Sequence, residues 1–291
     1  MELNPGHALL RSPPAMRPLA RRRLPLAATA LALSFLAVPR SPAQALATLH
    51  LQAAPGQTRV VAGNALAGPV QVRIFATSRP GFTAVPALPA EAVLPARGQR
   101  VIAHLYAGAD TDGAVAATGL GLEAVPGDPR ARAEDVAYRL PFDADAGIRV
   151  DQAWDGRFSH RDAENRYAVD FALATGTPVL AARRGTVMQV VDGVTGNRRA
   201  PGPDGVPANL VRVLHEDGTM AVYAHLAPGG MRVRPGEVVA AGQVLGLSGD
   251  SGLSTAPHLH FAVQANRGMR LVSLPFRMVV AAGELHFPRG D

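Results

Sequence analysis

The sequence predicts an all-β protein in which two β-rich domains follow an N-terminal leader. The chain has 291 residues, of which 30 are glycine and 25 are proline, while aromatic residues make up only 5%. Such a composition favours many short strands and turns over long helices. Apolar residues make up 47% of the chain, which is enough to bury sizeable cores. Several segments also alternate between apolar and polar residues, with the period of two that half-buried strands require.

The formal net charge of +6 belongs almost wholly to the N-terminus. All 29 basic residues are arginines, and six of them lie before residue 46 together with a single acid. The remainder carries 23 arginines against 22 acids, so we expect no nucleic-acid partner. The chain has no lysine and no cysteine, which excludes disulfides, thiol catalysis and lipoyl or biotinyl carrier chemistry. Any metal site must therefore use His, Asp or Glu.

Residues 1–45 are typical of a secretory signal peptide. An arginine triplet precedes an apolar run from Leu24 to Val38, and Ala43–Ala45 fits the small-residue cleavage motif. The run is shorter than the ~20 residues that a membrane-spanning helix needs, so we expect cleavage and no stable membrane insertion. The mature protein would then act in the periplasm or cell envelope. Either Met1 or Met16 could be the start.

Residues 46–140 predict a small N-terminal β-sandwich of the immunoglobulin-like type. Val70–Phe75, Arg100–Tyr106 and Leu120–Val125 alternate in polarity, and Gly- and Pro-containing turn clusters separate them. No group of residues in this region indicates chemistry. It would bind substrate, close the groove of the next domain or act as a spacer, and the sequence does not choose among these roles.

Residues 141–275 predict a second strand-rich domain, and residues 276–291 a C-terminal tail. Residues 193–209 form a long Gly-, Pro- and Arg-rich loop between two of its strands, and loops of that length are usually functional or mobile. The expected strands are Tyr167–Leu173, Pro178–Ala182, Gly185–Val191, Leu210–Leu214, Met220–His225, Val238–Leu247 and His258–Gln264.

Strand periodicity brings metal-binding side chains together in this second domain. His258 and His260 are two residues apart and share one face of a strand. Asp170 lies inside an apolar strand, where a carboxylate is costly unless it is paired or bound to metal. His160 lies ten positions upstream, on an expected loop. Three His and Asp ligands that leave one position for water match a catalytic zinc site, whereas the alternative is a surface pair without a role.

Other polar and aromatic residues leave two interpretations each. Tyr223 is expected to share a strand face with His225, where it would contact substrate or simply pack. Asn209 either fixes the backbone where the chain re-enters the sheet or binds substrate. Trp154 either packs or stacks on a glycan. The remaining histidines of the two domains are interpreted as ordinary residues: His50 and His104 in strands, His215 as a solvated turn residue and His286 near the C-terminus.

The segments around these residues resemble the lysostaphin/LytM-type zinc metallopeptidases. His160 with Asp170, Tyr223–Leu226 and His258–Phe261 look like the three signatures of that family. The resemblance covers about residues 150–265, and the combination is specific where any one piece would be weak. Further supporting segments are Gly176–Ala182, Arg234–Gly236, Gly242–Gly246 and Gly249–Gly252.

The resemblance implies a small antiparallel sheet with an active-site groove. It implies that His160, Asp170 and His260 bind zinc, Zn2+. His225 and His258 would be unliganded histidines that orient water and stabilise the tetrahedral oxyanion, one of them as general base. Members of the family hydrolyse peptide bonds in the cross-links or stem peptides of peptidoglycan, and some cut glycine-rich proteins.

One departure from the family pattern concerns the first two ligands. The family commonly has these His and Asp residues four apart, whereas here the separation is ten, so His160 is followed by an insertion at Arg161–Arg166. The leading hypothesis is an exported zinc metalloendopeptidase that acts on peptidoglycan peptides. The alternative is a non-catalytic module on the same fold that binds the cell wall or regulates a hydrolase. The bond that is cut, any self-inhibition of the groove and the oligomeric state stay open.

Overall fold

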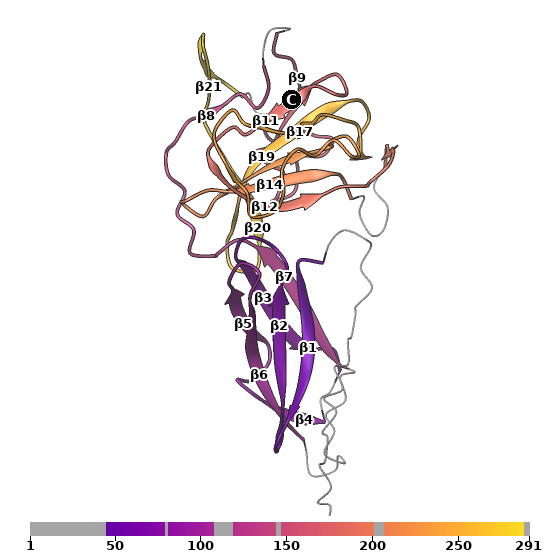
Figure 1. The fold of residues 1–291 in the computed structure, drawn as a ribbon, viewed down its shortest axis with the longest axis vertical. Helices are drawn as coiled ribbons and strands as arrows, with labels where there is room; N and C mark the ends of the chain where they lie inside the picture. Colours follow the sequence, from indigo (N-terminus) through magenta and orange to yellow (C-terminus); the bar gives the residue numbers. More distant parts are fainter. Residues whose placement is uncertain (1–44, 79–80, 108–118, 144–146, 201–206, 288–291) are drawn as a thin grey trace, which may run out of the picture. The chain divides into compact units, whose positions relative to one another are not determined.

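A computed structural model of the chain describes residues 45–78, 81–107, 119–143, 147–200 and 207–287 (Figure 1). Within these residues the regular structure is made of strands, and no α-helix occurs, which confirms the predicted all-β class. No helix among them is long and apolar enough to cross a membrane. The predicted leader falls outside the described residues, apart from Ala45.

The first strands form two antiparallel sheets that share one core, drawn in indigo to magenta in Figure 1. One sheet has the order β1-β2-β6-β4 and the other the order β5-β3-β7. Both contribute buried side chains to the core, for example Val60 from β2, Ile74 from β3 and Leu105 from β6. A sandwich therefore forms, because each sheet buries one face against the other. The strands are β1 (Ala47–Ala54), β2 (Gln57–Asn64), β3 (Val70–Ala76), β4 (Phe82–Val85), β5 (Ala90–Leu94), β6 (Gln99–Ala107) and β7 (Leu120–Pro126).

The following strands build a larger antiparallel sheet with the order β16-β12-β14-β15-β19-β10-β9, and β20 extends it beside β19. Its central pairs are in register over their whole length, as in Tyr223↔Phe261 and Asp170↔His260. The strands are β9 (Val150–Gln152), β10 (Val169–Ala172), β12 (Gly185–Val191), β14 (Leu210–Leu214), β15 (Met220–Ala224), β16 (Val238–Val239), β19 (His258–Asn266) and β20 (Leu271–Leu274).

The two faces of the large sheet have different chemistry because successive side chains of a strand alternate between faces. One face is apolar and forms the core of the second domain, around Phe171, Tyr223 and Phe261. The opposite face carries Asp170 and His260, which lie directly across from each other on adjacent strands. The alternation of side chains along each strand thus places the core on one face of the sheet and the polar site on the other.

Shorter pairs complete the second domain. β8 (Tyr138–Arg139) pairs in parallel with β21 (Met278–Val280), which pairs with β22 (Gly283–Leu285). Phe276 and Met278 are buried in the same core as the large sheet. We expected a tail after residue 275, but this segment adds strands and core side chains. The other short pairs are β11 (Pro178–Leu180) with β17 (Val244–Leu247) and β13 (Asn197–Arg198) with β18 (Gly252–Leu253).

A buried carboxylate, Asp217, holds the hairpin turn between β14 and β15. Its side chain is 1% exposed, accepts a 2.7 Å hydrogen bond from Arg183 and also accepts from the backbone and hydroxyl of Thr219. It further accepts from the backbone N–H of Glu134, in the segment that leads to β8. Burial alone would raise the pKa of Asp217, but these hydrogen bonds outweigh it and lower the pKa from 3.8 to about 2.

We expect Asp217→Asn to lower the free energy of unfolding by about 2 kcal/mol at neutral pH, since a two-unit pKa shift corresponds to that order. The stabilisation from a depressed carboxyl pKa is complete above 3.8 and is lost as the pH falls toward 2. The difference between variant and parent should therefore shrink below pH 4. Urea unfolding followed by Trp154 fluorescence tests this. Glu216→Gln is the control, because its ion pair with Arg184 is solvent-exposed and should contribute little. Equal midpoints for the Asp217 variant and the parent would contradict the prediction.

Candidate metal centre

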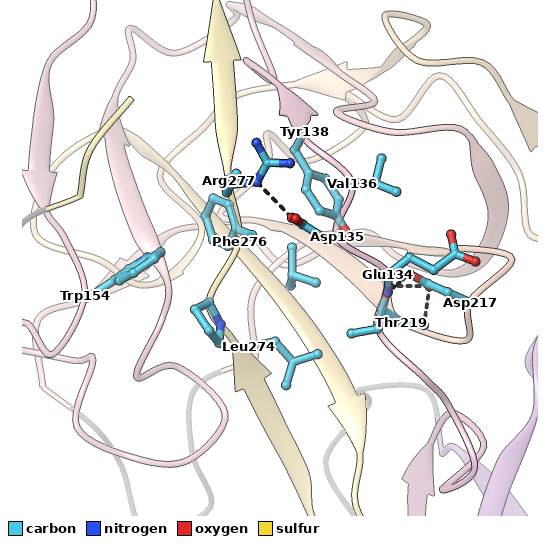
Figure 2. Close-up of a pocket in the computed structure, with 13 residues that line it drawn as sticks. Glu134, Asp135, Val136, Tyr138, Trp154, Asp217, Thr219, Leu274, Phe276 and Arg277 are labelled. Atoms are coloured by element: carbon cyan, nitrogen blue, oxygen red, sulfur yellow. Dashed lines mark hydrogen bonds and ion pairs between the residues drawn. The ribbon is translucent and has the colours of Figure 1, made fainter. Parts of the chain in front are cut away.

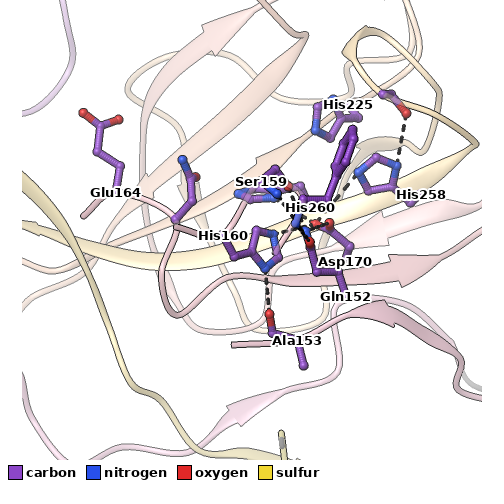
Figure 3. Close-up of polar contacts among 12 residues, drawn as sticks. Gln152, Ala153, Ser159, His160, Glu164, Asp170, His225, His258 and His260 are labelled. Atoms are coloured by element: carbon purple, nitrogen blue, oxygen red, sulfur yellow. Dashed lines mark hydrogen bonds and ion pairs between the residues drawn. The ribbon is translucent and has the colours of Figure 1, made fainter. Parts of the chain in front are cut away.

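Three potential metal ligands meet on the polar face of the large sheet (Figure 3). Asp170 lies on β10 and His260 directly opposite on β19, while His160 comes from the loop that precedes β10. Asp170 Oδ1 lies 2.9 Å from His260 Nδ1 and 3.2 Å from His160 Nε2. All three residues are nearly or fully buried, and their ligand atoms lie within 4.8 Å of one another.

The protonation of these groups fits a bound divalent cation. The Nδ1 atom of His160 lies 2.8 Å from the carbonyl oxygen of Ala153. Because a carbonyl only accepts, this Nδ1 donates to it, and Nε2 faces Asp170. Although burial would raise the pKa of Asp170, the neighbouring imidazoles hold it well below its usual range, so the carboxylate is charged. This charge would attract a metal ion, and the facing imidazole nitrogens could coordinate it.

The geometry also fits zinc. With metal–ligand bonds of about 2.0–2.2 Å, tetrahedral ligand atoms lie roughly 3.4 Å apart, close to the separations observed here. A set of two imidazoles and one carboxylate leaves the fourth position open, as in catalytic zinc sites. The site residues therefore fit the zinc that the sequence predicted.

Gln152 is a third partner of Asp170, which the sequence analysis missed. It lies opposite Asp170 on β9, and its Nε2 donates to Asp170 Oδ2 at 3.0 Å and to the hydroxyl of Ser159 at 2.7 Å. Its Oε1 accepts from the backbone N–H groups of Phe158 and Ser159. One amide thus orients the ligand carboxylate and the segment just before His160, a supporting role typical of metal sites. Only strand pairing reveals it.

Two further histidines stand beside the ligands. The ring centroids of His225 and His258 are 4.5 Å apart, and His258 Nε2 lies 3.9 Å from Asp170 Oδ1. His225 donates through Nδ1 to the carbonyl of Ser251 at 2.7 Å, and His258 donates through Nδ1 to the carbonyl of Ala256 at 2.8 Å. In the neutral form of either ring the lone pair is therefore on Nε2. Burial is the main cause that lowers the pKa of His225, to about 3, so this ring is neutral at physiological pH.

Tyr223 lies elsewhere than the sequence analysis expected. β15 ends at Ala224, and His225 adopts a left-handed backbone with φ of 63°. The strand alternation therefore stops before His225, and Tyr223 points to the opposite, apolar face. It is fully buried, packs against Phe261 and accepts a 2.7 Å hydrogen bond from the backbone N–H of Ala182. The expectation that Tyr223 shares a face with His225 was wrong, and a contact of Tyr223 with substrate has no support.

Asn209 matches the backbone-fixing interpretation. It is fully buried, and its side chain donates to the carbonyls of Val194 and Leu226 and accepts from the N–H of Val194. Its backbone N–H donates to the hydroxyl of Ser251. Asn209 therefore joins the start of the long loop to the backbone next to His225, and no polar group of its side chain is left for substrate.

Two other residues bear on the sequence analysis. The environment of His215 contradicts its interpretation, and that of Trp154 favours one of its two interpretations. His215, interpreted as a solvated turn residue, is 3% exposed, and burial lowers its pKa to about 4. That interpretation was wrong, because Tyr138 packs against its ring. Trp154 packs against Tyr167 and Phe276, which favours its packing role over glycan stacking.

A cavity of about 390 Å³ lies away from the ligands (Figure 2). Its walls come from the segment before β8, the β14–β15 turn and the segment after β20, and neither the three ligands nor the two flanking histidines line it. Its charged wall residues are already paired, Asp135 with Arg277 and both Glu134 and Asp217 with Arg183. It is therefore separate from the metal centre.

Comparison with known proteins places this site in a family. Residues 164–271 match the model of peptidase family M23, and the matched range includes Asp170, His225, His258 and His260. This domain belongs to peptidase family M23. His160 lies four residues before the matched range, so its place among the ligands rests on the geometry described above.

Several curated proteins are similar to the M23 domain. The chain is 37% identical over 103 residues to the glycyl-glycine endopeptidase ALE-1 of Staphylococcus capitis, covering 35% of this chain and 25% of that protein. It is 36% identical over 101 residues to lysostaphin of Staphylococcus simulans, covering 34% and 18%. It is 32% identical over 123 residues to the peptidoglycan DD-endopeptidase ShyA of Vibrio cholerae, covering 41% and 26%. The chain thus spans about a quarter or less of these relatives.

Solved structures are similar as well. The catalytic domain of lysostaphin from Staphylococcus simulans is 32% identical, with 41% of this chain and 81% of that chain covered and a TM-score of 0.31. A zinc-containing peptidase from Vibrio cholerae is 19% identical, with 75% and 55% covered and a TM-score of 0.36.

We expect the purified protein to bind about one equivalent of zinc, and Asp170→Ala to bind less than a tenth of that, because it removes the only anionic ligand. His225→Ala should keep the metal, since its ring makes no contact with Asp170 or His160 as close as a ligand requires. Elemental analysis after gel filtration in metal-free buffer measures both. Full zinc content in the Asp170 variant would contradict this ligand set.

Proposed function

We propose that the protein is an exported zinc metalloendopeptidase that hydrolyses peptide bonds in peptidoglycan, in cross-links or stem peptides. The observation that carries the proposal is the placement of two further imidazoles, each held at Nδ1 by a backbone carbonyl, beside a complete His-Asp-His ligand set. Zinc bound there would polarise the scissile carbonyl and lower the pKa of a water molecule.

The roles of the two flanking histidines follow from their tautomers. Each Nδ1–H is held by a backbone carbonyl, so each ring has one orientation and, in its neutral form, an Nε2 lone pair that can accept a proton. Once protonated, the same Nε2 donates a hydrogen bond to a negatively charged oxygen. We assign the general base to one of the two and stabilisation of the oxyanion to the other, as the family resemblance implies. The fixed orientation means that neither ring must reorganise during the reaction.

The substrate class and location are proposed from the relatives. Among those named above, ALE-1 is a glycyl-glycine endopeptidase and ShyA is a peptidoglycan DD-endopeptidase. The predicted leader would carry the chain to the periplasm or cell envelope, where peptidoglycan lies. The non-catalytic alternative has less support, because such a module would not need the ligand set and both flanking histidines together.

We expect purified protein to digest isolated sacculi and a chelator to stop the reaction. His258→Ala should slow hydrolysis by at least ~100-fold while zinc content is retained, since it removes a proton-transferring group but no ligand. His286→Ala is the matched control, because this exposed residue near the C-terminus takes part in no contact with the site. Sacculi digested at the parental rate by His258→Ala would overturn the assignment.

Mass spectrometry of the released muropeptides identifies the bond. Loss of cross-linked dimers indicates a cross-link endopeptidase, and shortened stem peptides indicate cleavage within the stem. Binding to sacculi without any release of peptides, by zinc-loaded protein, would favour the non-catalytic module.

A further inference from the structure

The loop between the first two metal ligands is held by the large sheet and not by the ligands alone. We call residues 161–166 the ligand loop. It is folded on itself, because the Asp162 side chain accepts hydrogen bonds from the backbone of Glu164 and Asn165. Its two ends lead to His160 and, through the following strand, to Asp170. The position of the ligand loop therefore decides whether His160 meets Asp170.

Gln264 and Ser273 provide the anchor points on the sheet. They are paired across β19 and β20, and both are buried. Gln264 Nε2 donates to the carbonyl of Glu164 at 2.9 Å. The backbone N–H of Ser273 donates to the carbonyl of Ala163 at 2.7 Å, and its hydroxyl donates to the same carbonyl and accepts from the N–H of Tyr167.

A buried arginine sets the orientation of the Gln264 amide. Arg212 on β14 is 7% exposed and donates to Gln264 Oε1 at 2.6 Å and to Gln189 Oε1 at 3.4 Å. Burial lowers the pKa of Arg212 to about 10, so the guanidinium stays charged at neutral pH. The negative charge of Glu164, in the ligand loop, opposes this lowering, although the two side chains do not form an ion pair. Because a guanidinium only donates, it turns the oxygen of Gln264 toward itself and leaves the nitrogen for Glu164.

We infer that Gln264 and Ser273 are positioning residues for the metal site. They hold the ligand loop against the sheet, which presents His160 to Asp170 before metal binds. Without them the loop would have to be ordered on binding, and the lost conformational entropy would weaken metal affinity. The inference concerns the metal site and does not depend on which peptide bond the protein cuts.

A matched pair of variants distinguishes two effects: loss of the hydrogen bond from Gln264 to the ligand loop, and addition of a negative charge beside Arg212. Gln264→Glu keeps an acceptor for Arg212 but replaces the donor to Glu164 with a repelling oxygen. Gln189→Glu adds the same charge beside Arg212, and Gln189 forms no hydrogen bond with the ligand loop. We expect zinc affinity, measured by competition with a chromophoric chelator, to fall ~10-fold or more for Gln264→Glu. It should stay within about twofold of the parent for Gln189→Glu.

Ser273 gives an independent test without a buried charge, should Gln264→Glu fail to fold. Ser273→Ala removes the hydroxyl contacts and should lower zinc affinity, and Ser273→Thr should restore it. Metal-free Ser273→Ala should also be cut faster by trypsin after Arg161 and Arg166, which are exposed, while Ser273→Thr is cut like the parent. Parental zinc affinity and cleavage in both Gln264→Glu and Ser273→Ala would overturn the inference. An equal loss of zinc affinity in Gln189→Glu would also overturn the inference, because the added charge beside Arg212 would then explain the loss in both variants.

Discussion

The charged carboxylate of Asp170, buried inside a sheet, is the constraint on which the site depends. A carboxylate in such a place is costly unless cations or hydrogen-bond donors surround it. Here two imidazoles face Oδ1 and the amide of Gln152 binds Oδ2. The arrangement gathers one carboxylate and two imidazoles where a metal ion would sit, so a carboxylate that would be costly in an ordinary sheet creates the metal site.

The rest of the site is organised by backbone carbonyls. Those of Ala153, Ser251 and Ala256 each accept from the Nδ1 of one histidine, which fixes its tautomer and directs Nε2 inward. Two of these carbonyls belong to the segment between β17 and β19, which the long loop reaches through the β13–β18 pair. The strands thus place Asp170 and His260, and the loops supply His160 and orient the rings.

Much of the fold and site could be predicted from residue types and spacing. The alternation around Asp170 and His258–His260 indicated strands with one polar face, and the structure pairs them in register. The roles of Tyr223 and His215 could not be predicted correctly. A single left-handed residue at His225 ends the alternation, and the packing of Tyr138 over a turn turns a polar hairpin residue into a buried one. Both depend on where strands stop and what covers them, which local pattern does not contain.

The sequence by itself determined the chemistry that is available: no thiol, no lysine, and a small set of His and Asp residues on strands of period two. It also indicated the M23 resemblance and the unusual ten-residue separation of His160 from Asp170. Only the tertiary structure decided how that separation is bridged, because the loop is held by Gln264 and Ser273, about a hundred residues away in the chain. Likewise only strand pairing showed Gln152 beside Asp170. Contacts between distant segments arise from sheet register and packing, whereas residue type and spacing limit what those contacts can do.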